Sequence, residues 1–367
     1  MNIYQHKKWP KFTWDVSKLA SLLASVRHKQ GKLTGRMISL GFDLQEEAML
    51  QTITQDVLKT SEIEGEHLNV DQVRSSVARK LGMDIGGSIP ADRHVEGVVD
   101  MLLDATQHYE SPINDERLFG WHAAMFPAGR SGMHKITVGS WRTPETGAMQ
   151  VVSGAMGKER VHFEAPQSEI VAQEMEAFFS WFNSEVDIDP VLKAAIAHLW
   201  FVTVHPFDDG NGRIARAVTD LQLARSDESK QRFYSMSAQI QKERKQYYEI
   251  LEKTQKGDLD ITKWLLWFLS CLGRALVQAE ETLNSVLNKA NYWNFLNTKS
   301  LNERQKLMMN KLLDGFDGKL TTSKWAKITK VSTDTALRDI QNLEEQGVLV
   351  KQLGGGRSTS YELGSLS

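Results

Sequence analysis

The segment from residue 190 to 204 is apolar on every side of a helix. Its sequence, PVLKAAIAHLWFVTV, would place aliphatic and aromatic side chains all around each helical turn. A helix with almost no polar face has to be surrounded by other elements. This segment therefore predicts the central helix of a mainly helical core, and apolar periodicity predicts further helices at about 46–64, 168–182, 212–225, 240–256 and 260–290.

The chain of 367 residues is long enough for two or three domains. Helical patterning at 16–27 and 46–64 predicts a small helical N-terminal domain at 1–80, followed by a core at 81–295. Short extended runs between 136 and 163, namely KITVGSW, MQVVSG and RVHF, predict a β-hairpin. At 300–367, three short helical patterns precede the two alternating runs of VLVKQLGGGRSTSYEL, an order typical of a winged helix-turn-helix.

Charge and cysteine content restrict the partners and the compartment. The formal net charge is −2, so no overall field attracts the chain to nucleic acid or to an anionic membrane. The single cysteine, Cys271, cannot form a disulfide within the chain, and its apolar neighbours predict a buried thiol. The N-terminus lacks the apolar stretch of a secretory signal, and Gly273 and Arg274 interrupt the most apolar segment. We expect a cytoplasmic protein without a membrane partner.

The loop HPFDDGNGRIAR, residues 205–216, joins the apolar segment to the next helix. Gly210 and Gly212 let the backbone approach a ligand, and a helix N-terminus offers N–H groups and a positive dipole end to phosphate. Arg213 and Arg216 are neighbours on the first turn of that helix, where each guanidinium can grip a phosphate. The loop therefore predicts a polyphosphate site.

Two further side chains of the loop suggest chemistry. Asp209 precedes the glycines, where its carboxylate could bind an Mg²⁺ ion that bridges two phosphates. His205 stands at the opposite lip, and an imidazole with an ordinary pKa of about 6.5 can take the proton of an attacking hydroxyl at neutral pH. Together these groups predict in-line transfer at phosphorus. The loop contacts phosphates and not the base, so the donor nucleotide stays open.

The loop resembles the motif HxFx[DE]GNGRxxR of the Fic family, and every defined position is filled. The resemblance implies that His205 is the catalytic base, that Asp209 is the Mg²⁺ ligand and that Asn211 contacts the α-phosphate. The intact GNGR tetrapeptide implies transfer of AMP from ATP, with release of pyrophosphate, to a serine, threonine or tyrosine hydroxyl of a target protein. Self-modification would use the same chemistry.

The same resemblance assigns the remaining phosphate and nucleotide contacts. Gly210 and Gly212 would complete an anion hole, with Arg213 and Arg216 on the β- and γ-phosphates. The hairpin resembles the family's target-positioning flap, whose nucleotide-lining residues would be Val151, Val152, Ser153 and Gly154. The segment QYYEILEKTQKGD resembles the part that closes over adenine, with Tyr247, Tyr248 and Gln255 as its contacts, although many members carry asparagine in place of this glutamine.

A segment that could inhibit the enzyme, here called the brake, precedes the core. The sequence TSEIEG, residues 60–65, resembles the family's inhibitory motif [ST]xxxE[GN]. A carboxylate at a helix C-terminus faces the negative end of the helix dipole, so Glu64 should seek a cation elsewhere. The resemblance makes Arg216 that cation and places Glu64 where the γ-phosphate would bind, which implies autoinhibition within the chain.

The flanking stretches WPKFTWD, VRSSVARKLG and GGGRSTSY resemble the branch of Fic proteins with a helical N-terminal domain and a C-terminal winged helix. In that last domain Ser332 would cap a recognition helix that carries Thr333, Thr335 and Arg338, with Lys351 and Arg357 on the wing. The same helix also carries four acidic residues, which oppose phosphate binding: Asp334, Asp339, Glu344 and Glu345.

Several alternatives remain open from the sequence. The winged helix could bind DNA, dock a protein or form a homodimer contact. The whole chain could act as a nucleotide-responsive transcription regulator, or remove AMP from a modified protein with Glu64 aligning the attacking water.

Overall fold

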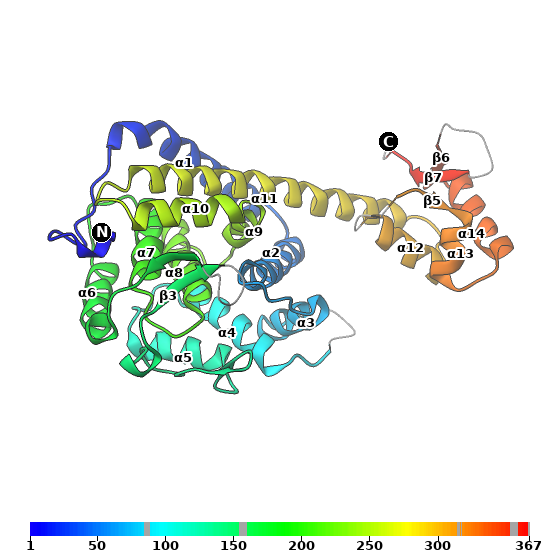
Figure 1. Ribbon diagram of the computed structural model, residues 1–367. Helices are drawn as coiled ribbons and strands as arrows, with labels where there is room; N and C mark the ends of the chain where they lie inside the picture. The colour runs from blue at the N-terminus through cyan, green and yellow to red at the C-terminus, as the bar shows by residue number, and fades with distance from the viewer. Residues whose placement is uncertain (84–88, 154–159, 314–315, 317, 353–358, 366–367) are drawn as a thin grey trace. The chain divides into compact units, whose positions relative to one another are not determined.

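A computed structural model describes all 367 residues except 84–88, 154–159, 314–315, 317, 353–358 and 366–367. Contacts divide the chain into two compact units, Met1–Glu281 and Thr282–Ser367. Both units are built mainly from helices, as the sequence predicted (Figure 1). The segment expected as an N-terminal domain, residues 1–80, lies within the first unit.

The first unit contains ten complete helices among its described residues and the start of an eleventh. They are α1 (Val16–Ile38), α2 (Phe42–Ile63), α3 (Val70–Lys80), α4 (Arg93–Gln107), α5 (Asp115–Met125), α6 (Val171–Asn183), α7 (Pro190–Val204), α8 (Asn211–Asp227), α9 (Met236–Lys242), α10 (Arg244–Gln255) and α11 (Thr262–Leu296), which ends in the second unit. Short 3-10 helices occupy Ile3–Gln5, Pro144–Thr146 and Ser168–Ile170. Two antiparallel hairpins pair β1 (Arg130–Ser131) with β2 (His134–Lys135), and β3 (Gln150–Ser153) with β4 (Arg160–Glu164).

Helix α7 is the central helix that the apolar segment predicted. Every residue after Pro190 is buried, and the helix packs against α6 and α8. Pro190 occupies the first turn, and the Asp189 carboxylate accepts a hydrogen bond from the Val191 N–H. The buried amine of Lys193 donates to the Ser184 carbonyl oxygen at 2.7 Å. Burial on all sides fixes the direction in which α7 delivers the loop at its C-terminus.

The structure corrects three details of the sequence prediction. Helix α1 continues to Ile38, and the predicted helix 240–256 is broken at Glu243 into α9 and α10. Residues 136–141 form no strand, because their surroundings offer other hydrogen-bond partners. The Thr137 N–H donates to Asp208 Oδ2 at 2.9 Å, so this part of the chain is tied to the 205–216 loop.

The second unit has the order of a winged helix-turn-helix. Its elements are α12 (Glu303–Leu313), β5 (Leu320–Thr321), α13 (Thr322–Thr329), α14 (Thr333–Glu345), β6 (Leu349–Lys351) and β7 (Ser360–Leu363), with sheet order β5-β7-β6. Trp325, Ile340 and Tyr361 belong to its buried core. Ser332 caps α14, as predicted, by accepting from the Thr335 N–H at 3.2 Å. Arg357 lies outside the described residues.

The segment at 264–277 forms part of α11 and is largely buried, although Arg274 and Val277 are exposed. Trp264, Leu265 and Leu272 have no exposed surface, and burial raises the pKa of the Cys271 thiol. Among helices in the described ranges, none has the length and apolarity needed to cross a bilayer.

Candidate active site

The 205–216 loop reverses the chain between α7 and α8. His205 ends α7 in a left-handed conformation, with φ of 52°, and its N–H donates to the Phe201 carbonyl oxygen at 3.0 Å. Gly210 has φ of +81°, and a Cβ there would lie 2.9 Å from the Phe126 ring. Both the backbone conformation and the close packing therefore require glycine at this position.

The side chain of Asn211 closes the loop from inside. Its Oδ1 accepts from the Phe207 N–H at 2.9 Å, and its Nδ2 donates to the Phe207 carbonyl oxygen at 2.8 Å. Asn211 is buried, so both hydrogen bonds are shielded from water. The residue that we assigned to the α-phosphate thus also holds the backbone of the loop.

The loop ends in an anion cradle at the start of α8. Within the described residues no side chain caps this helix, which leaves its first N–H groups available to a ligand. A Cβ at Gly212 would lie 2.1 Å from Glu64 Oε1 and 3.3 Å from Arg216 Nη1. The Glu64 carboxylate, at the C-terminus of α2, therefore lies against the backbone of the cradle.

Arg216 is held almost entirely by the end of α2. Its Nη2 donates to Glu64 Oε1 at 2.6 Å and to the Thr60 carbonyl oxygen at 2.9 Å. Its Nε donates to the Thr60 hydroxyl at 2.7 Å. Nη1 is buried without a hydrogen-bond partner in the described structure. The two defining residues of the TSEIEG motif thus both contact the second arginine of the loop.

Arg213 has different neighbours. Its Nη1 donates to Glu66 Oε2 at 2.7 Å, and its guanidinium lies 5.1 Å from the centre of the Phe126 ring. The other oxygen of Glu66 lies 2.7 Å from Nε2 of His94, at the start of α4. Neither Glu66 nor His94 belongs to a motif from which a site residue was predicted.

Asp209 is the carboxylate that the loop motif assigns to Mg²⁺. Its Oδ1 accepts from the Gly210 N–H, and the Ser131 hydroxyl donates to its Oδ2. The described residues contain no cluster of three or more His, Cys, Asp or Glu side chains suited to a metal. A single carboxylate beside a phosphate cradle nevertheless fits Mg²⁺, which takes its other ligands from phosphates and water.

The imidazole of His205 is arranged as a base. Its Nδ1 lies 3.1 Å from the Val202 carbonyl oxygen, which can only accept, so Nδ1 carries the proton and Nε2 has the lone pair. Burial lowers the pKa of His205 below its ordinary value, so the ring is neutral at pH 7. The Arg142 Nε–H donates to the His205 carbonyl oxygen at 2.8 Å and fixes the backbone there.

A second histidine lies beneath the loop. His122 of α5 stacks on Phe207 at 4.3 Å, accepts from the Gly139 N–H at Nδ1 and donates from Nε2 to the Asp209 carbonyl oxygen. Burial lowers the pKa of His122 to about 4, so this ring is neutral as well. The linear motif does not include His122 or Arg142, and only tertiary packing brings them to the loop.

The predicted flap is the hairpin of β3 and β4. Val151 pairs with Phe163, Val152 pairs with Val161 across a register shift, and Ser153 pairs with Arg160. Val152 is 49% exposed, while Gly154 lies outside the described residues. Glu252 of α10 accepts from His162 at 2.7 Å and from Arg160 at 3.2 Å, so strand β4 is held against α10.

The three residues assigned to adenine differ in exposure. Tyr247 and Gln255 are buried, the first bonded to His198 Nε2 at 2.8 Å and the second donating to the Val202 carbonyl oxygen at 3.2 Å. Tyr248 is 36% exposed, and its hydroxyl donates to the Ile63 carbonyl oxygen at 3.4 Å. Tyr248 is therefore the one of the three that reaches the end of α2.

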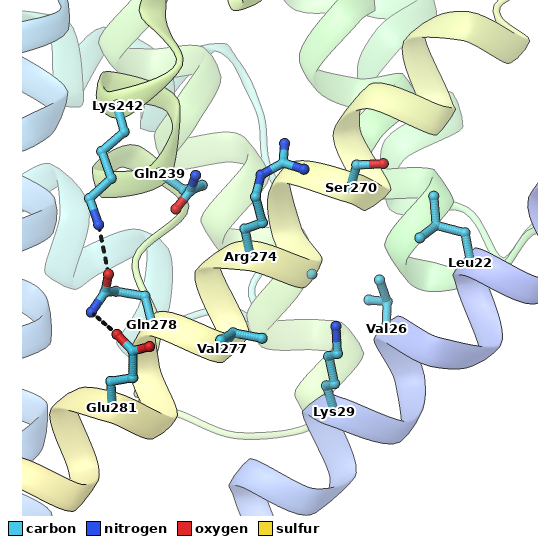
Figure 2. A pocket seen from close by; sticks show the side chains of 11 residues that line it. Leu22, Val26, Lys29, Gln239, Lys242, Ser270, Arg274, Val277, Gln278 and Glu281 are labelled. Carbon is cyan, nitrogen blue, oxygen red and sulfur yellow. Dashed lines mark hydrogen bonds between the residues drawn. The ribbon is translucent and has the colours of Figure 1, made fainter.

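A separate groove of about 480 Å³ lies between α1, α9 and α11 (Figure 2). Lys29, Lys242 and Arg274 line it, but Arg274 pairs with Glu243 and Lys242 donates to Gln278 at 2.7 Å. None of its lining residues belongs to the predicted site.

Three known domain families match parts of this sequence. The model of the Fic/DOC family matches residues 112–223, which include α5, the flap, α7 and most of the α8 helix that follows the loop. These residues form a Fic domain. A domain of unknown function, DUF4172, matches residues 2–83, and a DeoR-like helix-turn-helix domain matches residues 299–362.

Two animal proteins are similar in sequence to the part of the chain that contains the Fic domain. Protein adenylyltransferase fic-1 of Caenorhabditis elegans is 31% identical over 214 residues, which cover 58% of this chain and 38% of that protein. Protein adenylyltransferase Fic of Drosophila willistoni is 27% identical over 217 residues, covering 56% of this chain and 37% of the relative. The match thus spans less than two-fifths of the length of either relative.

A solved structure shares the fold. The crystal structure of a Fic family protein from Desulfovibrio desulfuricans aligns with a TM-score of 0.53 and 17% identity, and the alignment covers 98% of this chain and 99% of that one. At that identity the likeness shows the fold alone.

Proposed function

We propose that this protein transfers AMP from ATP to a serine, threonine or tyrosine hydroxyl of a protein target. One observation carries the proposal: a neutral imidazole with a free Nε2 stands at one end of a loop whose other end is a glycine-bounded cradle with two arginines. Glu64 lies against the cradle at Gly212, and the charges of Glu64 and Asp209 both act on the pKa of His205. The relatives named protein adenylyltransferases support this reaction.

The residues of the loop divide the work. The N–H groups at the start of α8, Arg213 and Arg216 would bind the phosphates. Asp209 would hold an Mg²⁺ ion, whose chemical contribution is to neutralise phosphate charge. His205 Nε2 would take the proton of the target hydroxyl as its oxygen attacks the α-phosphorus, and pyrophosphate would leave. Two arginines on the leaving phosphates would stabilise the charge that develops there.

We also propose that Glu64 inhibits this reaction. Its carboxylate lies against Gly212 and 2.6 Å from Arg216, in space that phosphate oxygens would otherwise occupy. A carboxylate and a phosphate carry the same sign of charge, so ATP cannot approach Arg216 productively until Glu64 moves. The contact lies within one unit of the chain and needs no second protein.

Differently labelled nucleotides test the reaction. The Glu64→Gly variant, incubated with α-labelled ATP and a cell extract, is expected to label proteins and itself, and γ-labelled ATP is expected to give no protein label. Label from γ-labelled ATP would indicate a kinase. No label from either nucleotide would reject the transfer reaction. Loss of AMP from a pre-modified target incubated with the unaltered chain, which keeps Glu64, would favour hydrolytic removal of AMP.

The second unit supports a further proposal, binding to DNA. A DeoR-like helix-turn-helix model matches it, and Lys327, Lys330 and Arg338 are exposed on α13, its C-terminus and α14. Asp339, which argued against DNA binding from the sequence, is buried and paired with Arg304 at 2.8 Å. An electrophoretic shift of promoter DNA by the full chain, weakened by Arg338→Ala and by salt, would support this function. The absence of a shift with the full chain would contradict DNA binding, and a shift unchanged by Arg338→Ala would exclude Arg338 from the contact.

A further inference from the structure

The two arginines on the first turn of α8 are neutralised in different ways. Arg216 meets one carboxylate, Glu64, and that carboxylate lies in the cradle itself. Arg213 meets Glu66, which is two residues further along the chain and also contacts His94. If Glu64 and Glu66 had the same role, we would expect the two arginines to have similar surroundings. The different surroundings of Glu66 therefore need an explanation.

Charge distinguishes the two arrangements. His94 Nδ1 lies 2.8 Å from the Met125 carbonyl oxygen, which can only accept, so Nδ1 carries a proton. Its Nε2 lies 2.7 Å from Glu66 Oε1 in an ion pair that is not an aligned hydrogen bond. A nitrogen lone pair that close to a carboxylate would be repelled, so Nε2 is protonated too. The contact with Glu66 accordingly raises the pKa of His94, and His94 lowers the pKa of Glu66.

With His94 protonated, Arg213, Glu66 and His94 form a row of two cations with one anion between them. His94 compensates the charge of Glu66, so Glu66 does not cancel the charge that Arg213 can offer to a phosphate. Arg216 and Glu64 form a one-to-one pair and leave no such excess. By charge alone, Glu64 opposes a phosphate and Glu66 does not.

Position leads to the same distinction. The atoms nearest to a Cβ built on Gly212 belong to Glu64 and Arg216, and none belongs to Glu66. Glu66 bonds only Nη1 of Arg213, while the guanidinium rests on the Phe126 ring. Arg213 is only 4% exposed, and in the described structure its buried Nε has no hydrogen-bond partner. An unpaired buried donor on an arginine held at two other points is prepared for an acceptor.

We propose that Glu66, anchored by His94, is a positioning residue that fixes Arg213 with its remaining N–H groups available to the phosphates of the nucleotide. The inference rests on the proposed function and assigns opposite effects to two carboxylates of one short segment. Glu64 blocks the cradle, and Glu66 prepares it. The competing interpretation is that Glu66 is a second brake, which would have to leave Arg213 before a phosphate could bind.

Direct binding separates the two interpretations. The parent is the full chain with Glu64→Gly and His205→Ala, which opens the cradle and prevents turnover. Calorimetry then measures its affinity for Mg-ATP and for AMP, with and without Glu66→Leu. We expect Glu66→Leu to weaken Mg-ATP binding about tenfold, as loss of one well-made charged contact does, and to change AMP binding less than about twofold. Glu66→Gln, which keeps an oxygen acceptor, should recover part of the loss.

Two more variants complete the test. His94→Leu should weaken Mg-ATP binding about threefold, because Glu66 stays but loses its anchor. Glu62→Gln is the matched control and should leave both affinities unchanged, since among the described residues Glu62 forms an ion pair only with Lys59, near the same helix end. Thermal melting of each variant checks that the fold is retained.

The outcomes are distinct. Tighter Mg-ATP binding by Glu66→Leu would establish a second brake and overturn the inference. Unchanged Mg-ATP binding would overturn it, and so would an equal loss of AMP binding, because a merely structural role would affect both nucleotides. A parent variant that binds no nucleotide at all would overturn the proposed function together with this inference.

Discussion

The loop at 205–216 and the segment at 60–66 meet at one cradle, but they are held in place in different ways. Buried side chains hold the loop from below, with Asn211, His122 and Arg142 only 2%, 0% and 3% exposed. The segment meets the loop through two carboxylates whose side chains are 31% and 38% exposed, Glu64 and Glu66. A buried polar group left unpaired costs about 1–3 kcal/mol, whereas a carboxylate near solvent can regain water.

The difference in burial indicates which part can carry out the reaction and which part can regulate it. The loop cannot move without leaving several buried groups unsatisfied, so its reacting groups keep their geometry. Of the two carboxylates, Glu64 can exchange Arg216 for water or for a competing anion at small cost, whereas Glu66 is also anchored by His94. On the proposed function, the fixed partner performs the reaction and the exchangeable partner regulates it.

The largest expected effect comes from removing the base in the fixed partner. In the Glu64→Gly background, His205→Ala should lower kcat/KM for AMP transfer by about 10²- to 10⁴-fold, because the hydroxyl proton loses its acceptor. Label transfer from α-labelled ATP to a purified target measures the rate. His28→Ala, at an exposed histidine on α1, is the control and should keep full activity. A fully active His205→Ala variant would remove the imidazole from the reaction.

Removing the exchangeable partner should have the opposite sign. Glu64→Gly frees Arg216 from a charged hydrogen bond of the kind that contributes about 1.5–3 kcal/mol, so the rate should rise about 10- to 100-fold. The same assay measures the change, and Mg-ATP should raise the Tm of the variant more than that of the unaltered chain. Glu62→Gln should change neither quantity. An unaltered rate in Glu64→Gly would reject the brake.

A change in the loop should lower the free energy of unfolding more than a change at Glu64 does. Asn211→Ala leaves the N–H and carbonyl groups of Phe207 buried without their partner and should lower the free energy of unfolding by about 1–3 kcal/mol. Glu64→Gln keeps an oxygen that can accept from Arg216 and removes only a partly exposed charge, so it should cost less than about 1 kcal/mol. Urea unfolding of both variants makes the comparison. A larger loss in Glu64→Gln would mean that the segment, and not the loop, is the more firmly held partner.

Much of the fold around the loop could be predicted because the residues that determine it are contiguous in the sequence. The all-apolar helix α7, the loop motif and the TSEIEG segment each lie within a short stretch, so spacing and residue type were sufficient. His94, His122 and Arg142 are separated from the loop by many residues, and only the packing of α4 and α5 brings the two histidines to it. The predicted strand at 136–141 failed for a related reason. Its composition suits a strand, but Asp208, far along the chain, takes the Thr137 N–H.

The smallest expected effect is a shift in pH dependence. Burial lowers the pKa of His205, so the base form persists at neutral pH and is lost only as the pH falls through that lowered pKa. Activity of Glu64→Gly should therefore be nearly flat from pH 6.5 to pH 8 and should decline only below about 6.5, the ordinary value for histidine.

The charge of Glu64 acts in the other direction and raises the pKa of His205, so the two partners of the comparison are coupled electrostatically. Removing that charge in Glu64→Gly should move the acidic limb of the rate profile to lower pH than in the unaltered chain. Rate profiles of Glu64→Gly and the unaltered chain, measured at saturating nucleotide, give the two apparent pKa values. A limb that moves to higher pH in Glu64→Gly would show that the carboxylate does not face the imidazole, and the single shared space assumed for base, brake and phosphate would then be wrong.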